Sequence, residues 1–229
     1  MPDEPVLLIT GASSGIGAAT ARHAAAEGWR LVLAARSEDR LGELADELGE
    51  GRAAVVRCDV QSWDDQQAAV RSALDSFGRL DASLANAGFG AKRGFLEEEV
   101  DFWRDMILTN VYGVALSIRA ALAHFRDQGR GHMLLTSSVA GRRALPGSLY
   151  SATKFAVTAM GEALRQEVSD SDIKVTLIEP GMVDTPFFDE AKPDALRADD
   201  IARAVLYALS QPPHVDVNEV LVRPIRQPL

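Results

Sequence analysis

The sequence predicts one α/β domain, a doubly wound parallel sheet of about seven strands with helices on both faces. Short apolar runs, typical of strands covered on both faces, alternate with helical segments along the 229 residues. The connections between them are short, and right-handed crossovers then give a parallel sheet. A composition of 47% hydrophobic and 25% charged residues suits one domain with a full core.

The first unit is a strand, a glycine-rich turn and a helix. Residues 6–9 form a continuous apolar run, and residues 10–17 carry three glycines at the spacing GxxxGxG. Alanine-rich helical sequence continues to about Glu27 and stops at Gly28. Glycines at this place let the chain turn tightly and let a phosphate approach the free N–H groups of the helix. The unit therefore predicts a dinucleotide-binding site.

The second strand, residues 30–35, ends at Arg36. At this point of dinucleotide folds an acidic residue binds the free 2′-hydroxyl of NAD, whereas an arginine accommodates the 2′-phosphate of NADP. No acid stands at Ala34, Ala35 or Arg36. We therefore expect NADP(H), with NAD(H) possible. The other interpretation of Arg36 is a solvated surface arginine.

Strands and helices continue to alternate through the rest of the chain. The expected strands cover residues 53–57, 81–85, 132–136, 173–178 and 218–222, and the expected helices cover 38–48, 63–77, 100–126, about 150–169 and 199–210. We expect residues 186–197, with two prolines, to form a flexible segment or lid.

Small or polar residues follow several strands, at the edge where open parallel sheets bind ligands. Asp59 follows the third strand and either reaches an adenine or caps the helix that begins near Ser62. Residues 86–88, Asn-Ala-Gly, follow the fourth strand and permit close approach of a ligand. Asn110 lies within a long helix, where its propensity is poor, so it is either exposed or has a polar role.

Tyr150 and Lys154 are four residues apart, which places them on one face of a helix. A free tyrosine has a pKa of about 10. A neighbouring ammonium favours the phenolate and lowers that pKa. Such a pair can exchange a proton with a reacting oxygen. The spacing alone is also common in solvated surface pairs, so the surrounding motifs decide between the two interpretations.

With these motifs in their order and approximate spacing, nearly the whole chain resembles the short-chain dehydrogenase/reductase family, in its single-domain YxxxK branch. The resemblance implies a Rossmann-type fold with a cofactor half of roughly residues 1–90 and a catalytic and substrate half of roughly 91–229. It also implies an NADP(H)-dependent oxidoreductase that interconverts a secondary alcohol and a ketone. The residues that carry it are 10–17, 86–88, Asn110, 137–141, Tyr150, Lys154, Pro180, Gly181 and Thr185.

The resemblance implies a role for each matching residue. Tyr150 would be the acid in ketone reduction and the base in alcohol oxidation. Lys154 would lower the pKa of Tyr150 and hold the nicotinamide ribose, and Ser138 would hydrogen-bond the carbonyl oxygen. Asn110 would hold a water that relays protons to Lys154. The expected cofactor contacts are Gly11, Ser13, Ser14, Gly15, Ile16, Gly17, Arg36, Asp59, Val60, Asn86, Ala87, Gly88, Tyr150, Lys154, Pro180, Gly181, Val183 and Thr185.

Two adjacent serines are candidates for the catalytic serine, and we choose between them by the residues that follow each rather than by the separation from Tyr150. Ser137 stands thirteen residues before Tyr150, which is the usual separation in the family. Ser138 instead matches the motif, because residues 139–141, Val-Ala-Gly, follow it. We expect Ser138 to be the catalytic serine, with one residue deleted in the loop that follows.

Several classes of protein do not fit the sequence. A net charge of −9 argues against a general nucleic-acid surface. The four histidines are dispersed without metal-ligand spacing, so we expect no metal. Neither a signal peptide nor an apolar stretch long enough to cross a bilayer is expected, and a cytoplasmic location is the default.

Three other functions remain in view. One is an NAD(H)-dependent alcohol dehydrogenase of the same fold, and another is a nucleotide-sensing binding protein without turnover, which would not need all four catalytic residues. The third is an enoyl reductase of the same superfamily, but the resemblance there implies Tyr and Lys seven residues apart, whereas in this chain they are four apart. The family also implies a homodimer or homotetramer, formed through the helices of Asn110 and Tyr150.

The substrate, its stereochemistry and the physiological direction do not follow from the sequence. Four basic residues are expected in loops near the pocket mouth, where one could bind a substrate carboxylate or all could be solvated: Lys92, Arg93, Arg142 and Arg143. The last strand and the tail, residues 217–224, look similar to the branch of NADP-dependent 3-hydroxy acid and serine dehydrogenases.

Overall fold

The computed structural model describes residues 4–188, 190 and 192–227. The strands of the main sheet are β1 (Val6–Thr10), β2 (Arg30–Ala35), β3 (Ala53–Arg57), β4 (Ala82–Ala85), β5 (Arg130–Thr136), β6 (Asp172–Pro180) and β9 (Glu219–Val222). The helices are α1 (Gly15–Ala26), α2 (Glu38–Leu48), α3 (Trp63–Phe77), α4 (Val100–Ile107), η1 (Leu108–Gly113), α5 (Val114–Gln128), η2 (Val139–Gly141), α6 (Leu149–Glu167) and α7 (Ala198–Leu209).

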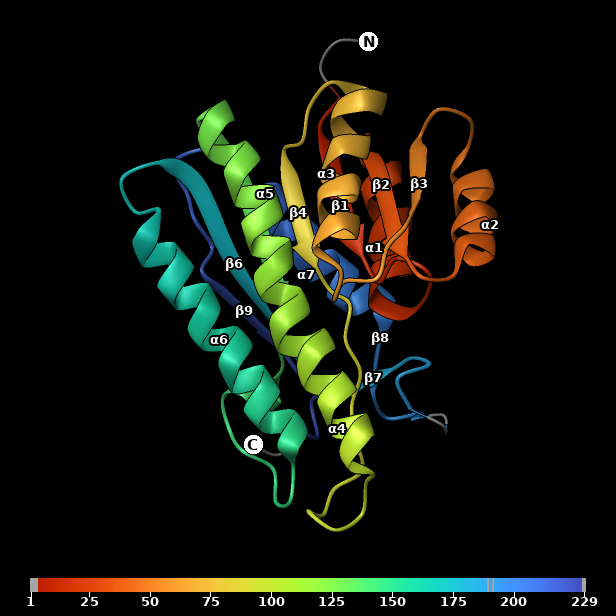
Figure 1. Cartoon of the computed structure of the whole chain (residues 1–229), viewed down its shortest axis with the longest axis vertical. Helices are drawn as coiled ribbons and strands as arrows, with labels where there is room; N and C mark the ends of the chain where they lie inside the picture. The colour runs from red at the N-terminus through yellow and green to blue at the C-terminus, as the bar shows by residue number, and fades with distance from the viewer. Residues whose placement is uncertain (1–3, 189, 191, 228–229) are drawn as a thin grey trace.

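The seven strands form one parallel sheet in the order β3-β2-β1-β4-β5-β6-β9 (Figure 1). The chain starts at the centre with β1, builds outward to β3, and then crosses to β4 and builds the other half. The strand order therefore reverses between β1 and β4, which is where ligands bind in open α/β sheets. The predicted fold class is confirmed, including the number of strands and the single domain.

Helices cover both faces of the sheet. Buried residues of α3, α5 and α6 pack on one face, and those of α1, α2 and α7 pack on the other. In β1, Val6 and Leu8 face the first layer while Leu7 and Ile9 face the second. Both sides of each central strand are therefore apolar, which explains the runs without alternation in the sequence.

The long helix predicted from residue 100 is continuous but not uniform. The segment η1 is π-helical and lies between α4 and α5. By length and composition alone the combined helix Val100–Gln128 could cross a bilayer, contrary to our expectation from the sequence. A core helix of a soluble fold meets the same criteria, and α5 buries Val114, Ala121 and Phe125 against the sheet.

The predicted lid contains a feature that the sequence did not suggest. Strand β8 (Leu196–Arg197) pairs with β7 (Val183–Asp184) in a small parallel sheet of its own. This pairing joins the two ends of the segment that leaves β6. Residues 189 and 191 of the predicted lid lie outside the described part of the chain. Elsewhere the predicted bounds agree closely with the observed ones, and β2, α2, β3 and α3 coincide with them.

Candidate active site

The glycine-rich turn between β1 and α1 is shaped for close approach. Gly11 and Gly15 have positive φ values of 67° and 53°, where a side chain is strained. A Cβ atom on Gly17 would lie 2.3 Å from the carbonyl oxygen of Gly11. No side chain caps the N-terminus of α1 at Ser14, so its first N–H groups face outward for an anion. The other partly exposed residues of the turn are Ser13 and Ile16.

The end of β4 is tied to this turn. Thr10 Oγ1 accepts hydrogen bonds from the backbone N–H of Asn86 at 3.0 Å and of Ala87 at 3.3 Å. Asn86 Nδ2 in turn donates to the Thr10 carbonyl at 3.3 Å. A Cβ atom on Gly11 would lie 2.9 Å from Ala87 Cα, and one on Gly88 would lie 3.0 Å from the amide oxygen of Asn110. The structure thus brings these two predicted cofactor segments into contact.

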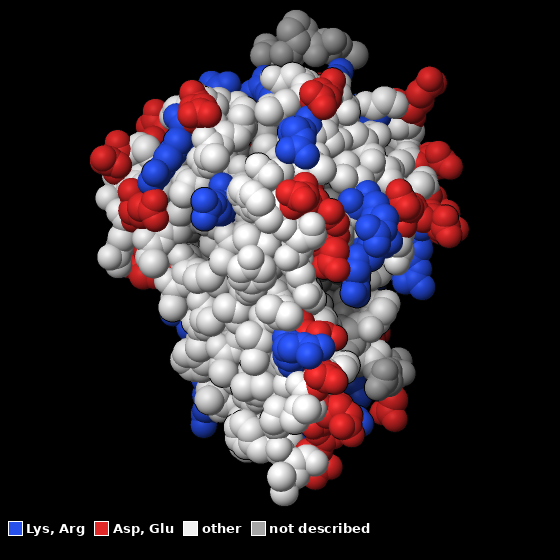
Figure 2. Space-filling model, in the orientation of Figure 1, with Lys and Arg blue, Asp and Glu red and all other residues white. Residues whose placement is uncertain are grey.

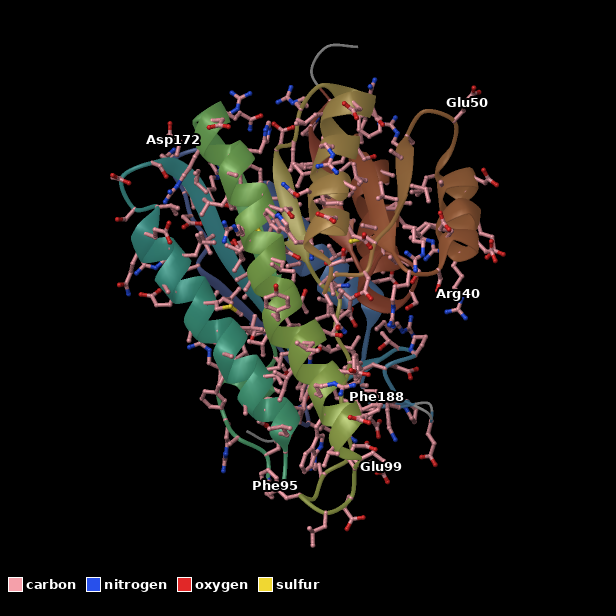
Figure 3. All side chains as sticks on the ribbon, viewed as in Figure 1. Arg40, Glu50, Phe95, Glu99, Asp172 and Phe188 are labelled. Atoms are coloured by element: carbon pink, nitrogen blue, oxygen red, sulfur yellow. The ribbon has the colours of Figure 1, made fainter. Side chains whose placement is uncertain are left out.

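Arg36 is exposed at the end of β2, where it lines an open hollow of about 650 Å³ at the start of α2. Arg40, which the sequence analysis missed, lines the same hollow and an adjoining one that includes Ser13 of the glycine turn. Neither guanidinium forms an ion pair with a described residue. Figure 3 shows Arg40 extending from the lower end of α2, on the side where the strands end. Glu38, Asp39 and Glu43 line the same hollow, so the two guanidinium groups share it with three carboxylates.

Asp59 and Val60 follow β3. Asp59 Oδ1 accepts from the N–H of Gln61 at 3.0 Å, and the cap of α3 is instead Ser62, whose hydroxyl accepts from Asp65 N. Capping of that helix by Asp59, one of our two alternatives, is therefore wrong. Val60 is 8% exposed and packs within the core, which makes it an apolar wall at this edge.

Tyr150 and Lys154 lie in the first two turns of α6. Lys154 is only 4% exposed, and its Nζ donates to the carbonyl oxygen of Thr136 at 2.8 Å, at the end of β5. The same Nζ lies 5.7 Å from the centre of the Tyr150 ring. The lysine therefore connects the edge of the sheet to the tyrosine.

The two serines after β5 have different partners. Ser138 Oγ accepts from the N–H of Ala140 at 3.1 Å and donates to the carbonyl of Pro180 at 3.3 Å, and the Ser138 hydroxyl also lowers the pKa of Tyr150. Ser137 Oγ donates to the backbone carbonyl of Lys154 at 3.1 Å and lies 2.8 Å from Thr158 Oγ1. Ser138 therefore lies beside the Tyr150 hydroxyl, as its motif suggested, whereas the Ser137 hydroxyl contacts Lys154 and Thr158 of α6.

Burial sets the protonation of the pair. It raises the pKa of Tyr150 to about 12, because the phenolate is desolvated, and the hydrogen bond with Ser138 acts in the opposite direction. Burial also lowers the pKa of Lys154 to about 8. The net shift of the Tyr150 pKa is thus upward, and burial is its largest cause. A phenol with this pKa keeps its proton at neutral pH, which is the state that an acid in ketone reduction needs.

Asn110 is fully buried in η1, so of our two alternatives the polar role is correct. Its Oδ1 accepts from the N–H of Phe89 at 3.0 Å, and its Nδ2 donates to the Phe89 carbonyl at 2.8 Å and to Thr153 Oγ1 at 3.2 Å. The amide therefore fixes the loop after β4 beside α6. That Asn110 holds a water for Lys154 stays a prediction.

The turn after β6 closes the other side of the site. Gly181 N donates to the carbonyl of Val222 in β9 at 2.7 Å, which fixes the turn that begins at Pro180. Val183 is 6% exposed in β7 and joins the core. The Thr185 side chain faces Gly15 of the glycine turn. The structure thus brings the last of the predicted cofactor residues to the turn that follows β1.

An aromatic residue of the segment beyond β7 covers the tyrosine. The ring of Phe187 packs edge-on against Tyr150 with 5.6 Å between centroids, and Phe188 packs on Phe187 at 5.1 Å. A Cβ atom on Gly90 would lie 2.7 Å from the Phe187 ring. Figure 3 shows Phe188 beside β7. Two adjacent aromatics in an irregular segment carry no periodic sequence pattern, so Phe187 was missed.

Arg142, which we expected at the pocket mouth, is exposed but paired with two carboxylates. Its Nε donates to Glu179 Oε1 at 2.7 Å, and its other nitrogen pairs with Glu219. It is therefore not a free cation for a substrate. Lys92 and Arg93 are exposed.

Comparisons with known proteins agree with this geometry. A family model described as short chain dehydrogenase matches residues 5–196. An uncharacterised oxidoreductase of Staphylococcus haemolyticus is 41% identical over 224 residues, covering 96% of this chain and 97% of that protein.

Solved structures are equally similar in fold. The alcohol dehydrogenase of the archaeon Thermococcus sibiricus, complexed with 5-hydroxy-NADP, is 32% identical with a TM-score of 0.90 and 99% of both chains covered. The serine dehydrogenase of Escherichia coli is 29% identical with a TM-score of 0.90, covering 98% of this chain and 100% of that one. Similar structures include complexes with NADP and with NAD.

Proposed function

This chain belongs to the short-chain dehydrogenase/reductase family of oxidoreductases, and from that premise we propose that it transfers a hydride between NADP(H) and a secondary alcohol or ketone. The observation that carries the proposal is the meeting of Ser138, Tyr150 and Lys154 at the carboxyl ends of β5 and β6. A hydroxyl pair with a cation behind it suits a carbonyl oxygen that gains negative charge.

The proposed chemistry divides the work between protein and cofactor. The nicotinamide supplies or accepts the hydride when it is bound. Ser138 and Tyr150 donate hydrogen bonds to the substrate oxygen, and Tyr150 gives it a proton during reduction. Lys154 provides the positive charge that favours the phenolate left behind. Asn110 holds Phe89 and Thr153 in place around this centre.

The chain's own residues fit the cofactor. The Gly17 position leaves no room for a side chain, and the uncapped start of α1 suits a pyrophosphate. Arg36 and Arg40 line one hollow and form no ion pair with the described part of the chain, which favours the 2′-phosphate of NADP(H). NAD(H) is the alternative, because the same fold holds either cofactor.

Titration with NADPH and NADH, followed by cofactor fluorescence, tests the preference. We expect tighter NADPH binding, and Arg36→Ala should weaken it about 10- to 100-fold while leaving NADH unchanged, which is the range for a charge-assisted hydrogen bond. Arg126→Ala, at the far end of α5 and paired with Glu167, is the control. Preferential NADH binding would overturn the assignment to Arg36, and no binding of either cofactor would overturn the proposed function.

We propose a neutral ketone rather than a keto acid as substrate. Phe187 covers Tyr150, and Arg142 is committed to Glu179 and Glu219. The E. coli relative is a serine dehydrogenase, and serine carries a carboxylate, so a screen should include both classes. Higher kcat/KM for 3-keto acids than for neutral ketones would contradict the proposal.

A second copy of this chain is the proposed partner. Exposed apolar side chains lie along the helices that form one layer, namely Val100, Ile107, Tyr112 and Phe155. Figure 2 shows a largely uncharged area over α5 and α6 in the lower half of the view. Light scattering should give a dimer or tetramer that Tyr112→Glu dissociates, whereas Tyr207→Glu on α7 should leave a dimer. A monomeric wild-type chain would contradict this.

A further inference from the structure

A carboxylate interrupts the apolar row that β6 turns toward α6. Val175 and Leu177 of this row are core residues, and the next residue on the same side is Glu179, which is 1% exposed. Burial raises the pKa of Glu179, and the nearby Arg142 acts against that rise. A buried charge of this kind costs stability unless a partner compensates it, so its position calls for an explanation.

The partner of Glu179 comes from the loop that carries the catalytic serine. Arg142 directly follows η2, and its Nε donates to Glu179 Oε1 at 2.7 Å. At the other end of the same short segment, Ser138 Oγ donates to the carbonyl of Pro180 at 3.3 Å. The segment 138–142 is thus attached at both ends to consecutive residues of β6.

The same carboxylate also reaches the catalytic helix. Thr158 Oγ1 lies 3.4 Å from Glu179 Oε1 and 2.8 Å from Ser137 Oγ, and Ser137 Oγ lies 3.1 Å from the backbone carbonyl of Lys154. The two hydroxyl protons fill two of these three contacts at a time. A Cβ atom on Gly141 would lie 2.6 to 2.7 Å from three atoms of this chain of hydrogen bonds. The loop and the helix are therefore packed against one polar network.

We propose that Glu179, held by Arg142, is a positioning residue that fixes the Ser138 hydroxyl against Tyr150. This inference rests on the proposed function, since it assigns a role around that centre. The network touches the serine loop, the Lys154 backbone and the end of β6, and these segments support Ser138 and Lys154. Small errors in such positions cost large factors in rate.

The charged groups around the network are few. Arg142 faces Glu179 from the loop, Glu219 faces Arg142 from β9, and Lys154 lies on α6. The side chain of Glu219 is 48% exposed, whereas Glu179 is buried. The two glutamates therefore offer a matched comparison, because each binds the same arginine but only Glu179 reaches the network.

The kinetic test compares Glu179→Gln with Glu219→Gln. Glu179→Gln keeps the size of the side chain and removes its charge. It should lower kcat for ketone reduction about tenfold and leave the KM for NADPH within about twofold, as expected for a lost alignment. Glu219→Gln should change neither. If the two variants have equal kcat values, the inference is wrong.

The pH dependence of activity is a second measurement, and a simple loss of stability would not shift it. The hydrogen bond with Ser138 lowers the pKa of Tyr150, so loosening Ser138 raises it. Alcohol oxidation needs the phenolate, so its kcat/KM rises with pH as Tyr150 loses its proton. In Glu179→Gln this rise should therefore occur at higher pH. The profile of Glu219→Gln should match that of the wild type. An unshifted limb in Glu179→Gln would contradict the inference.

Amide hydrogen exchange separates this inference from the proposed function. Peptides that cover residues 137–143 should exchange faster in Glu179→Gln than in Glu219→Gln, whether or not a substrate is known. If the wild type reduces no ketone with NADPH, the proposed function fails while this comparison still decides whether the network positions the loop. Equal exchange in both variants would overturn the inference even in an active enzyme.

Discussion

The ammonium nitrogen of Lys154 lies 5.7 Å from the centre of the Tyr150 ring while it donates to the Thr136 carbonyl at 2.8 Å. The hydrogen bond to Thr136 fixes the position of the ammonium beside Tyr150, because it holds a long flexible side chain at the edge of the sheet. The charge is also almost fully buried, so little water screens its effect on the phenol. The protonation of this lysine should therefore control the chemistry of the tyrosine.

Ketone reduction should decline as the pH rises through about 8. The pKa of Lys154 is lowered to about 8 by burial, so the cation is present below that pH and is lost above it. The measurement is log kcat/KM for reduction between pH 6 and 10. A profile that stays flat through pH 9 would show that the lysine keeps its proton.

Replacing Ser138 by Ala should lower kcat about 10²- to 10³-fold, the usual cost of losing one hydrogen-bond donor to a developing oxyanion. Ser137→Ala should cost much less, because that hydroxyl bonds to the Lys154 backbone and to Thr158. Steady-state kinetics of both variants at saturating cofactor make the comparison. A larger loss in Ser137→Ala would return the catalytic role to the serine at the usual family spacing.

Phe187→Ala should widen the entrance at Tyr150 and raise kcat/KM for bulky aryl ketones about tenfold relative to small ketones, a ratio typical of reshaped apolar pockets. Gly90→Ala should have the opposite effect, since its Cβ would press on the Phe187 ring. Tyr207→Ala, which removes an exposed aromatic ring on α7, is the control. Equal changes for all ketones in Phe187→Ala would mean that the ring does not select substrates.

His132 should make the protein sensitive to mild acid. Burial lowers its pKa to about 3, and its Nε2 lies 2.8 Å from Thr176 Oγ1. The unfolded chain takes up a proton near pH 6.5 that the folded chain refuses, so stability falls as the pH drops from 6.5 toward 3.

Urea unfolding at pH 7 and pH 5 measures this effect. The wild type should lose about 2 kcal/mol more than His132→Gln over that interval, at about 1.4 kcal/mol per pH unit below 6.5. His124→Gln, at a half-buried site on α5, should behave like the wild type. The same acid sensitivity in His132→Gln would exclude the histidine as the cause.

Local signals predicted the elements and the outline of the site. Buried parallel strands read as apolar runs, and glycines such as Gly28 and Gly78 stop the helices that follow. The serine choice also followed from neighbouring residues. What the sequence could not provide depends on partners far along the chain. The contact of Glu179 with Arg142 spans 37 residues, and Phe187 meets Tyr150 from an irregular segment. The effect of burial on the Tyr150 pKa likewise appears only when the core is assembled.

The π-helical turn of η1 also limits how the chain length can change. Asn110 lies within this turn and enters the site, whereas Val114 and Phe125 lie beyond it in α5 and enter the core. Deleting one residue between 108 and 113 would rotate the whole of α5 by about 100° relative to α4. Either the Asn110 amide would lose its contacts with Phe89, or the apolar side of α5 would no longer face the sheet. Insertions and deletions should therefore be tolerated in the loop before α4 and rejected within this helix, although both segments belong to the same half of the chain.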